Sequence, residues 1–355
     1  MRIAQVAPLF ESVPPRRYGG TERVVSYLTE ELVRQGHRVT LFATSDSTTS
    51  ARLVPVVQRP LRGDPLWLFH ALIEVEKVFQ LAEEFDVVHF HADGLHYPLL
   101  RHTWTPVVTT LHGRLDLPGL PRFYRVFSHV PVVSISDAQR LPLPHARWVG
   151  TVPHGLPSGL YRQGSGTGGY LVFLGRISPE KRVDRAVEIA RRVGLPLRIA
   201  AKVDPVDRTY FEREIEPLLG RPGVDFLGEI GDAEKVALLG QAVALLFPID
   251  WPEPFGLVMI ESMACGTPVL AFRGGAVEEV LTPGVTGAIV SSVDEAVAVL
   301  PRVMALDRSR CRREFERRFS AARMARDYVR VYERLATDVR GVGVPGPDAG
   351  AASHG

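Results

Sequence analysis

Two glutamates carry the most specific chemical signal in this sequence. Glu253 and Glu261 stand eight positions apart in the segment Pro252-Glu-Pro-Phe-Gly-Leu-Val-Met-Ile-Glu261. Pro252 and Pro254 fix their own φ angles and disfavour helix in the residues before them, so Glu253 is expected in a loop. Glu261 falls inside the helix predicted to follow, over 257–264. The first N–H groups of that helix lack intrahelical acceptors, and such groups attract anions, phosphate above all.

A second cluster of charged residues lies in Phe173-Leu-Gly-Arg176-Ile-Ser-Pro-Glu-Lys181, which runs from the end of a predicted strand into a helix. Arg176 offers a planar fork of donors to an anion, and Lys181 offers a point charge. Alone, this pair is typical of two surface cations. Together with the Glu253 segment it predicts a site that neutralises a diphosphate. No Asp-x-Asp occurs in the chain, so the paired carboxylates that often hold Mg²⁺ on a diphosphate are missing, and we predict no metal.

Further candidates come from the first half of the chain. His112 directly follows the predicted strand 107–111, so it should project into a cleft at the carboxyl end of the sheet. Gly19 and Gly20 precede a helix that is predicted to open at Thr21, with Glu22 in its first turn. By itself this is a glycine-rich helix start.

Two other groups have a structural interpretation that competes with a functional one. His89, His91 and His96 could be metal ligands, but no carboxylate or cysteine stands at ligand spacing, so strand-end packing and cleft lining are favoured. The segment 114–125 mixes arginines with aromatic residues. An ordinary packed helix is favoured there over a contact with a membrane surface or an anionic acceptor.

The elements that position these residues alternate between short apolar strands and longer helical patterns. In the first half we predict strands over 3–7, 38–43, 86–90, 107–111 and 130–135, with helices over 21–34, 66–84 and 117–126. In the second half we predict strands over 170–175, 197–201, 224–227, 242–247, 268–272 and 287–290. The helices expected there span 183–193, 210–219, 233–239, 257–264 and 293–306, and two more are expected between 307 and 340. This βαβ order predicts an α/β protein with two doubly wound parallel sheets.

The domain boundary is predicted where composition changes. Residues 154–169 are rich in Gly, Pro, Ser and Gln, which is typical of a linker. We therefore predict one domain over 1–158 and a second over 168–319, with a helix at about 320–340 that could pack back on the first domain. The tail 341–355 is expected to be disordered.

Bulk composition excludes several classes of protein. A chain of 355 residues is too long for one typical core. A net charge of +2 gives no reason to expect a nucleic-acid partner. Cys265 and Cys311 are the only cysteines, which favours a reducing cytosol over a disulfide framework. No apolar run is long enough to span a membrane, so membrane contact is expected to be peripheral at most, at the inner surface. The oligomeric state is not predicted.

These segments together resemble the retaining glycosyltransferases of the GT-B fold, in the large sequence family numbered 4. The resemblance rests on motifs in the family's order, which extend over nearly the whole chain: Tyr18-Gly-Gly-Thr-Glu22, the Thr-x-His-Gly segment at His112, Gly-Arg…Glu-Lys at 175–181, Glu-x7-Glu at 253–261, Gly274-Gly-Ala-Val-Glu278 and Gly284-Val-Thr-Gly287. Two positions depart from the family pattern. His154 replaces the usual Asn, and Arg182 replaces a common Gly.

The resemblance implies a role for each matching position. Arg176 and Lys181 would bind the donor diphosphate, Glu253 and His112 would lie near the transferred sugar, and Glu261 would hold the ribose. Backbone groups at Phe255, Gly256 and Leu257, the loop residues Gly19 and Gly20, and the base-binding segment at Gly228 and Ile230 would complete the donor site. The acceptor side is expected at Tyr18, Thr21, Glu22 and His91.

We therefore expect a hexosyltransferase that moves a sugar from a UDP- or GDP-linked donor to a small-molecule, glycan or lipid-linked acceptor, with retention and without a metal or other cofactor. Two alternatives stay open. One is a sugar-nucleotide epimerase or phosphorylase on the same fold, and the other is a non-catalytic sugar-nucleotide binding protein.

Overall fold

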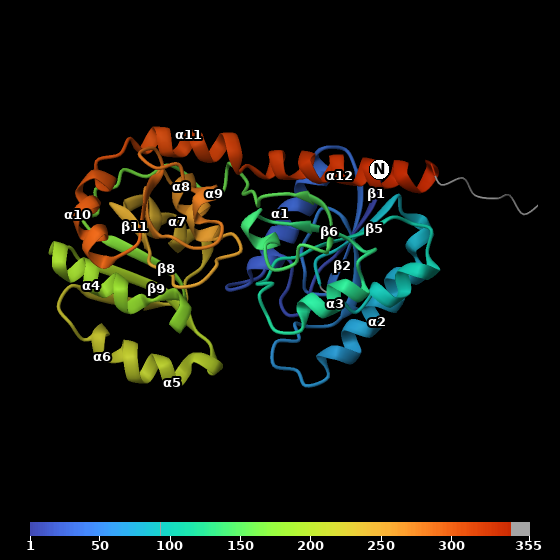
Figure 1. Cartoon of the computed structure of the whole chain (residues 1–355), viewed down its shortest axis with the longest axis horizontal. Coiled ribbons are helices and arrows are strands. Elements are labelled where there is room, and N and C mark those ends of the chain that lie inside the picture. Colours follow the sequence, from blue (N-terminus) through green and yellow to red (C-terminus); the bar gives the residue numbers. More distant parts are fainter. Residues whose placement is uncertain (93, 342–355) are drawn as a thin grey trace, which may run out of the picture.

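The computed structural model describes residues 1–92 and 94–341, and side chains up to residue 337. The tail that was predicted to be disordered, 341–355, lies outside the described residues except for Gly341. Within them, two parallel sheets form two Rossmann-like domains that stand side by side (Figure 1). Helix α11 (Arg308–Arg318) lies over the C-terminal domain, and α12 (Ala321–Gly341) lies over the N-terminal domain.

The N-terminal domain is built on a seven-stranded parallel sheet in the order β3-β2-β1-β4-β5-β6-β7. Its strands are β1 Arg2–Val6, β2 Arg38–Thr44, β3 Arg52–Val57, β4 Val87–Phe90, β5 Val107–Thr110, β6 Pro131–Ser134 and β7 Arg147–Thr151. Its helices are α1 Gly20–Arg34, α2 Trp67–Gln80 and α3 Leu120–Val126, with short 3₁₀ turns at Ala82–Glu84, Tyr97–His102 and Ala138–Arg140. The strand order reverses direction between β1 and β4, which places a crevice at their carboxyl ends.

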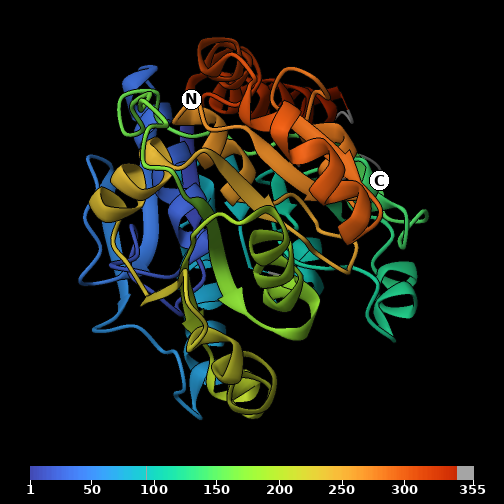
Figure 2. The same ribbon diagram turned by 90° about the vertical axis from the view of Figure 1, so that its left-hand side faces the viewer.

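The C-terminal domain repeats this architecture with six strands in the order β10-β9-β8-β11-β12-β13. The strands are β8 Leu171–Ile177, β9 Leu197–Val203, β10 Val224–Gly228, β11 Ala244–Phe247, β12 Val269–Phe272 and β13 Gly287–Val290. The helices are α4 Val183–Val193, α5 Arg208–Tyr210, α6 Glu216–Leu219, α7 Asp232–Gln241, α8 Leu257–Ala264, α9 Val277–Val280, α10 Val293–Met304 and α11 Arg308–Arg318. Figure 2 looks onto this domain, with α4 and α10 together on one side of the sheet.

The predicted doubly wound architecture is confirmed, and the two strands that sequence patterns missed are both edge strands. β3 contains Pro55, which cannot donate to a ladder and is tolerated at an edge. β7 is short and contains Gly150. Neither strand carries the continuous apolar run of a central parallel strand, because one side of each is open to solvent.

The predicted helix over 210–219 is broken rather than continuous. A π-helical turn over Phe211–Ile215 separates α5 from α6, which contains Pro217. Proline lacks the N–H that would continue the α-helical ladder and clashes with the carbonyl four residues earlier, so a wider turn accommodates it.

The chain crosses between the domains twice, and the two crossings are hydrogen-bonded to each other. Leu156 donates its N–H to the Phe319 carbonyl at 2.8 Å and accepts from the Ala321 N–H at 2.8 Å. After the second crossing, α12 (Ala321–Gly341) packs against α1 of the N-terminal domain, as the sequence predicted for this region. Tyr328 and Tyr332 of α12 are fully buried there.

Replacing Gly155 by Ala should weaken this junction. A Cβ at Gly155 would lie 2.4 Å from the Ser320 carbonyl oxygen, which belongs to backbone and cannot swing away. We expect the free energy of unfolding to fall by about 1–3 kcal/mol. Urea denaturation measures it, with Gly159→Ala as the matched control, because a Cβ at Gly159 meets no atom within 4 Å. Equal midpoints for the two variants would contradict this account of the junction.

Candidate active site

The two charged segments predicted from sequence lie side by side because they follow neighbouring strands. Arg176 is near the carboxyl end of β8, and Lys181 ends the 3₁₀ turn that follows it. Glu253 lies in the loop after β11, which pairs with β8 in parallel. The β8–β11 pair is also the point where the strand order of this sheet reverses, and open α/β sheets bind ligands there.

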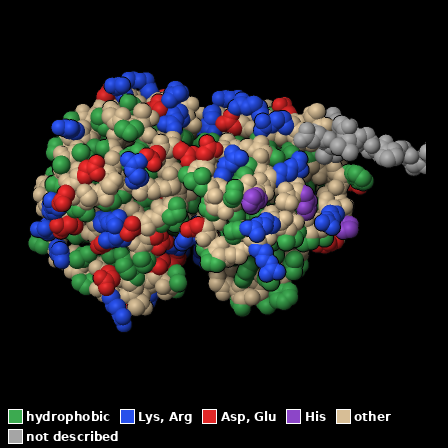
Figure 3. Space-filling view, viewed as in Figure 1, with side chains coloured by type: hydrophobic (Ala, Val, Ile, Leu, Met, Phe, Trp, Pro, Cys, Tyr) green, Lys and Arg blue, Asp and Glu red, His purple; other side chains and the backbone are tan. Residues whose placement is uncertain are grey.

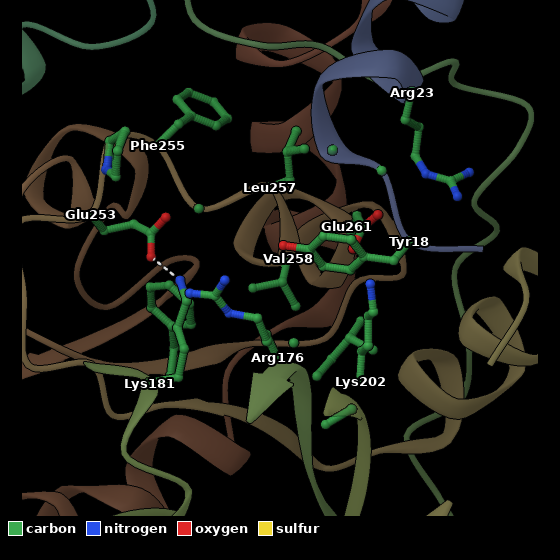
Figure 4. Close-up of a pocket in the computed structure, with 18 of the residues that line it drawn as sticks. Tyr18, Arg23, Arg176, Lys181, Lys202, Glu253, Phe255, Leu257, Val258 and Glu261 are labelled. Carbon is green, nitrogen blue, oxygen red and sulfur yellow. Dashed lines mark hydrogen bonds and ion pairs between the residues drawn. The ribbon is translucent and has the colours of Figure 1, made fainter. Parts of the chain in front are cut away.

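Lys181 and Glu253 form a direct ion pair, drawn as a dashed line in Figure 4. The Trp251 indole N–H donates to the same carboxylate oxygen, Oε2, at 3.0 Å. The Lys181 ammonium also lies 4.8 Å from the centre of the Trp251 ring. Glu253 is only 8% exposed, so its carboxylate is held by two donors in a largely desolvated position.

The backbone of the Glu253 loop is held by the Gly274-Gly275 turn. The Ala276 N–H donates to the Glu253 carbonyl at 2.9 Å. A Cβ at Gly275 would lie 2.2 Å from that same carbonyl oxygen, and Gly275 has φ +56°. Glycine is therefore required at this position both for space and for backbone conformation.

Helix α8 begins directly after this loop and points its N-terminus into the same space. Gly256 caps it in the left-handed conformation (φ +83°), and no side chain caps the first turn. The N–H groups at the first turn, including those of Leu257 and Val258, are therefore available to a ligand. Glu261, one turn further on, accepts hydrogen bonds at 2.8 Å from both Tyr161 Oη and Lys235 Nζ.

The loop at 182 shows how this chain tolerates a non-glycine residue where the family commonly has glycine. Arg182 adopts φ +54° and is the one non-glycine residue with positive φ among those described. Its guanidinium group pairs with Asp184 at 2.7 Å and with Asp250 at 2.9 Å. These contacts tie the start of α4 to the loop after β11 and offset the backbone strain.

A cavity of about 370 Å³ lies between the two domains and gathers these groups. The space-filling view shows the molecule hollowed between its two halves (Figure 3). The N-terminal domain contributes the loop before α1, and the Tyr18 N–H donates across the cleft to Glu229 Oε1 at 2.9 Å. Figure 4 shows Arg176 and Lys181 on one side of the cavity and the start of α8 on another, with Tyr18 reaching in from the N-terminal domain.

Most residues that the sequence predicted for the site line this cavity. They are Tyr18, Gly19, Gly20, Thr21, His112, Arg176, Lys181, Ile230, Glu253, Phe255, Gly256, Leu257 and Glu261. His154, singled out as a departure from the family pattern, lines it too.

Three predicted site residues lie outside the cavity lining. His91 is buried behind His112, because it follows β4 on the inner side of the sheet and bonds to Gln5. Glu22 is only 4% exposed and faces the interior from the first turn of α1. Gly228 ends β10 at a register shift, and the residues after it, Glu229 and Ile230, reach the cavity instead.

Comparison with known proteins identifies the class to which this geometry belongs. The family model described as "Glycosyl transferases group 1" matches residues 163–318, and that described as "Glycosyltransferase Family 4" matches residues 18–149. The solved structure of AviGT4, a glycosyltransferase involved in avilamycin A biosynthesis, superposes with a TM-score of 0.72 at 24% identity, covering 95% of this chain and 98% of that one. The chain is a glycosyltransferase with the GT-B fold.

Several relatives have named activities. The phosphatidyl-myo-inositol mannosyltransferase of Mycolicibacterium smegmatis is 28% identical to this chain, and the match covers 100% of this chain and 98% of that protein. The GDP-mannose-dependent alpha-(1-6)-phosphatidylinositol dimannoside mannosyltransferase of Mycobacterium tuberculosis is 36% identical over 42% of this chain and 38% of its own. The structure of HepE from Anabaena in complex with UDP and glucose superposes with a TM-score of 0.71 at 17% identity. The match covers 94% of this chain and 100% of that one.

Sequence reasoning missed four charged or aromatic residues of the cavity. Arg23, Lys202, Lys235 and Trp251 all line the cavity. Arg23 of α1 pairs across the domains with Asp232 of α7, and Lys235 contacts both Asp232 and Glu261. Three of them had a usable signal: Lys202 directly follows a predicted strand, Arg23 directly follows Glu22, and Trp251 stands two positions before Glu253. Lys235 lies within a predicted helix, and no motif in the sequence marks it.

Within the segment 114–125, only the residues from Leu120 onward are helical (α3), and this helix packs on the N-terminal domain as the sequence favoured. Tyr124 of α3 is buried and Phe123 packs on Tyr97 at 5.6 Å, while Arg122 and Arg125 are exposed. Among the described residues no group of three or more His, Cys, Asp or Glu is placed to hold a metal ion. Nor is any helix in the described ranges long and apolar enough to cross a membrane.

Four buried histidines and the half-buried His112 are neutral imidazoles in the glycosyltransferase. Burial lowers the pKa of His96 and of His112 to about 3, and it lowers the pKa values of His89, His91 and His154 well below the usual range. His89 bonds to Tyr332 and Thr110, both at 2.7 Å, and His96 bonds to Thr109 at 2.8 Å. These partners keep the rings hydrogen-bonded without a charge.

Stability should therefore fall steeply as the pH drops below about 6.5, the ordinary pKa of histidine. Below that pH the histidines of the unfolded chain bind protons, whereas the folded rings stay neutral because their pKa values are lowered. The free energy of unfolding therefore decreases as pH decreases. His96→Gln should reduce the slope of that free energy between pH 5 and 6 by about 1.4 kcal/mol per pH unit. Urea denaturation across this range measures the slope. At pH 8 the variant and the wild type should have parallel pH dependence, and an unchanged slope at pH 5–6 would contradict the account.

Proposed function

We propose that this glycosyltransferase moves a hexosyl unit from a nucleoside diphosphate sugar to an acceptor hydroxyl, with retention of anomeric configuration and without a metal. The observation that carries the proposal is the placement of Arg176 and Lys181 opposite the uncapped N-terminus of α8, across one cavity. Departure of a nucleoside diphosphate develops negative charge, and preorganised cations and amides stabilise it most effectively.

Each part of the donor has a matching group in the cavity. The diphosphate would lie between the Arg176 and Lys181 cations and the first N–H groups of α8. Glu261 is an acceptor-only group at the far side of the helix start and suits a ribose diol. Glu253, 8% exposed and held by Trp251 and Lys181, would meet hydroxyls of the transferred sugar.

Two finer features of the proposal rest on the arrangement of the side chains. Arg176 and Lys181 would neutralise the diphosphate charge, and the sequence lacks an Asp-x-Asp motif that could hold a metal. Both features support a metal-independent reaction. Glu253 is held by Lys181 and Trp251, and we propose that it contacts the sugar while the acceptor attacks on the same face as the departing phosphate.

An acceptor attached to a lipid is favoured by the surface next to the cavity. Helix α2 and the residue before it expose six large apolar side chains, each at least 41% accessible: Leu66, Trp67, Leu68, Phe69, Leu72 and Ile73. The Trp67 ring lies 5.6 Å from Phe10, which belongs to the same loop as the cavity residue Tyr18. Hydrophobic side chains gather along this margin of the N-terminal domain in Figure 3.

The relatives' names agree with such an acceptor. They act on phosphatidyl-inositol substrates, and one is GDP-mannose-dependent. We therefore propose a peripheral contact between α2 and a membrane, from which the cavity receives a lipid-linked hydroxyl. GDP-mannose is the first donor to test.

Donor class is tested by a thermal-shift panel of nucleotides and nucleotide sugars, followed by turnover with the donor that binds. A nucleoside diphosphate should stabilise the protein more than its monophosphate, and EDTA should leave the rate unchanged. Lys181→Ala should abolish the extra shift and lower the transfer rate about 10²–10³-fold, as loss of one preorganised donor does. Lys77→Ala is the matched control, because Lys77 is half-buried on α2 and does not line the cavity. No shift with any nucleotide would overturn the proposal.

The two alternative functions give different products. An epimerase or phosphorylase would convert a labelled donor without any new glycoside, so product analysis separates it from a transferase. A non-catalytic binding protein would keep nucleotide binding in Glu253→Gln, and its wild type would show no turnover with any acceptor.

The contact with a membrane is tested by vesicle sedimentation. Phe69→Glu combined with Ile73→Glu should reduce binding to phosphatidylinositol-containing vesicles at least tenfold, because each apolar side chain contributes about 1.5–3 kcal/mol when buried. Val206→Glu is the control, since Val206 is 84% exposed on the other domain. Equal binding by all three proteins would exclude α2 as the contact.

A further inference from the structure

A buried row of hydrogen bonds runs from helix α12 to the back of His112. Tyr332 of α12 accepts from the Gln5 amide Nε2 at 3.1 Å, and Gln5 Oε1 contacts His91 Nε2 at 2.7 Å. His91 Nδ1 then lies 2.9 Å from His112 Nε2. Gln5 and Tyr332 are fully buried and His91 is 3% exposed, so no bulk water competes for these contacts.

The row decides which of the two nitrogens of each ring carries the proton. A side-chain amide oxygen only accepts, so His91 must carry its proton on Nε2. His91 is neutral, which leaves its Nδ1 as an acceptor. His112 Nε2 must then donate to that nitrogen, and the second nitrogen of neutral His112, Nδ1, is left with a lone pair.

The nitrogen that remains on His112 has no partner in the protein. His112 Nδ1 is buried and makes no hydrogen bond, although His112 itself lines the cavity. One face of the ring is covered by His154, which stacks at 5.3 Å between ring centres with 14° between the planes. The ring is thus fixed by His91 at one edge and by His154 on one face.

We infer that His91 is a positioning residue that holds His112 in the Nε2-protonated tautomer, so that Nδ1 accepts a hydrogen bond from a substrate hydroxyl. The inference rests on the proposed transferase function for the identity of that hydroxyl, which belongs to the donor sugar or the acceptor. It assigns a function to His91 that does not require contact with the substrate. The row also makes α12 part of the support of the site.

The tautomer is observable directly in the full-length protein. Long-range ¹H–¹⁵N correlation spectra of histidine-labelled enzyme distinguish a neutral ring protonated on Nε2 from one protonated on Nδ1. The His112 resonances among the 11 histidines are assigned by their loss in His112→Asn. We expect the Nε2-protonated pattern for both His91 and His112. An Nδ1-protonated His112, which a reversed Gln5 amide would produce, overturns the inference.

Kinetics of two His91 variants separate positioning from mere packing. His91→Leu removes the acceptor for His112 Nε2 and should lower kcat about 10–100-fold, the usual cost of losing an outer hydrogen-bond partner. Donor KM should change much less, because Arg176 and Lys181 are untouched. His91→Asn places an amide oxygen near the position of Nδ1 and should restore most of the loss. Exposed His145→Asn serves as the control and should match the wild type.

The outcomes are distinct. Wild-type kcat in His91→Leu, or no recovery in His91→Asn with a normal nucleotide thermal shift, overturns the inference. If His91→Leu does not fold, Tyr332→Phe tests the same row one step further back, and a wild-type spectrum and rate in that variant would count against it. If wild-type enzyme transfers no sugar, the proposed function fails, while the spectrum still decides the tautomer.

Discussion

The ion pair between Lys181 and Glu253 is the interaction on which the rest of the site depends. It joins the turn after β8 to the loop after β11, and so links the two segments that sequence alone placed in separate parts of the chain. Trp251 and the Gly274-Gly275 turn serve mainly to hold Glu253 in reach of Lys181. A diphosphate bound beside this pair would share Lys181 with Glu253, so donor binding and the position of the sugar-facing carboxylate are coupled. Removing either partner would leave a nearly buried charge unpaired.

Sequence patterns predicted the central elements well because those elements have the strongest periodicity. Helices 183–193 and 257–264 were predicted with the bounds they have in the structure, and every central strand was found. Edge strands β3 and β7 escaped because Pro55 and Gly150 interrupt patterns that are already half exposed. The break at Phe211–Ile215 was missed although its cause, Pro217, stands inside the predicted helix 210–219.

The site was predicted where one continuous segment carries it and missed where several elements meet. The Glu253–Glu261 segment and the Arg176–Lys181 segment each combine a strand end, a turn and a helix start, and these features are local. Lys235 and Arg23 reach Asp232 from different helices, and only the tertiary fold brings them together. His91 shows the opposite case, since its place beside a strand end was evident but its partner Gln5 is 86 residues away. Relatives below 25% identity establish the fold, and the chemistry has to be argued from these contacts.

The paired crossings at Leu156 and Phe319–Ala321 have a mechanical consequence. Two backbone segments that run side by side and are hydrogen-bonded to each other resist shear and twist between the domains, but they bend readily about the line through both. Helix α12 is anchored on the first sheet by Tyr328 and Tyr332, so a relative motion of the domains that preserves these hydrogen bonds has to be a bending about the line through both crossings.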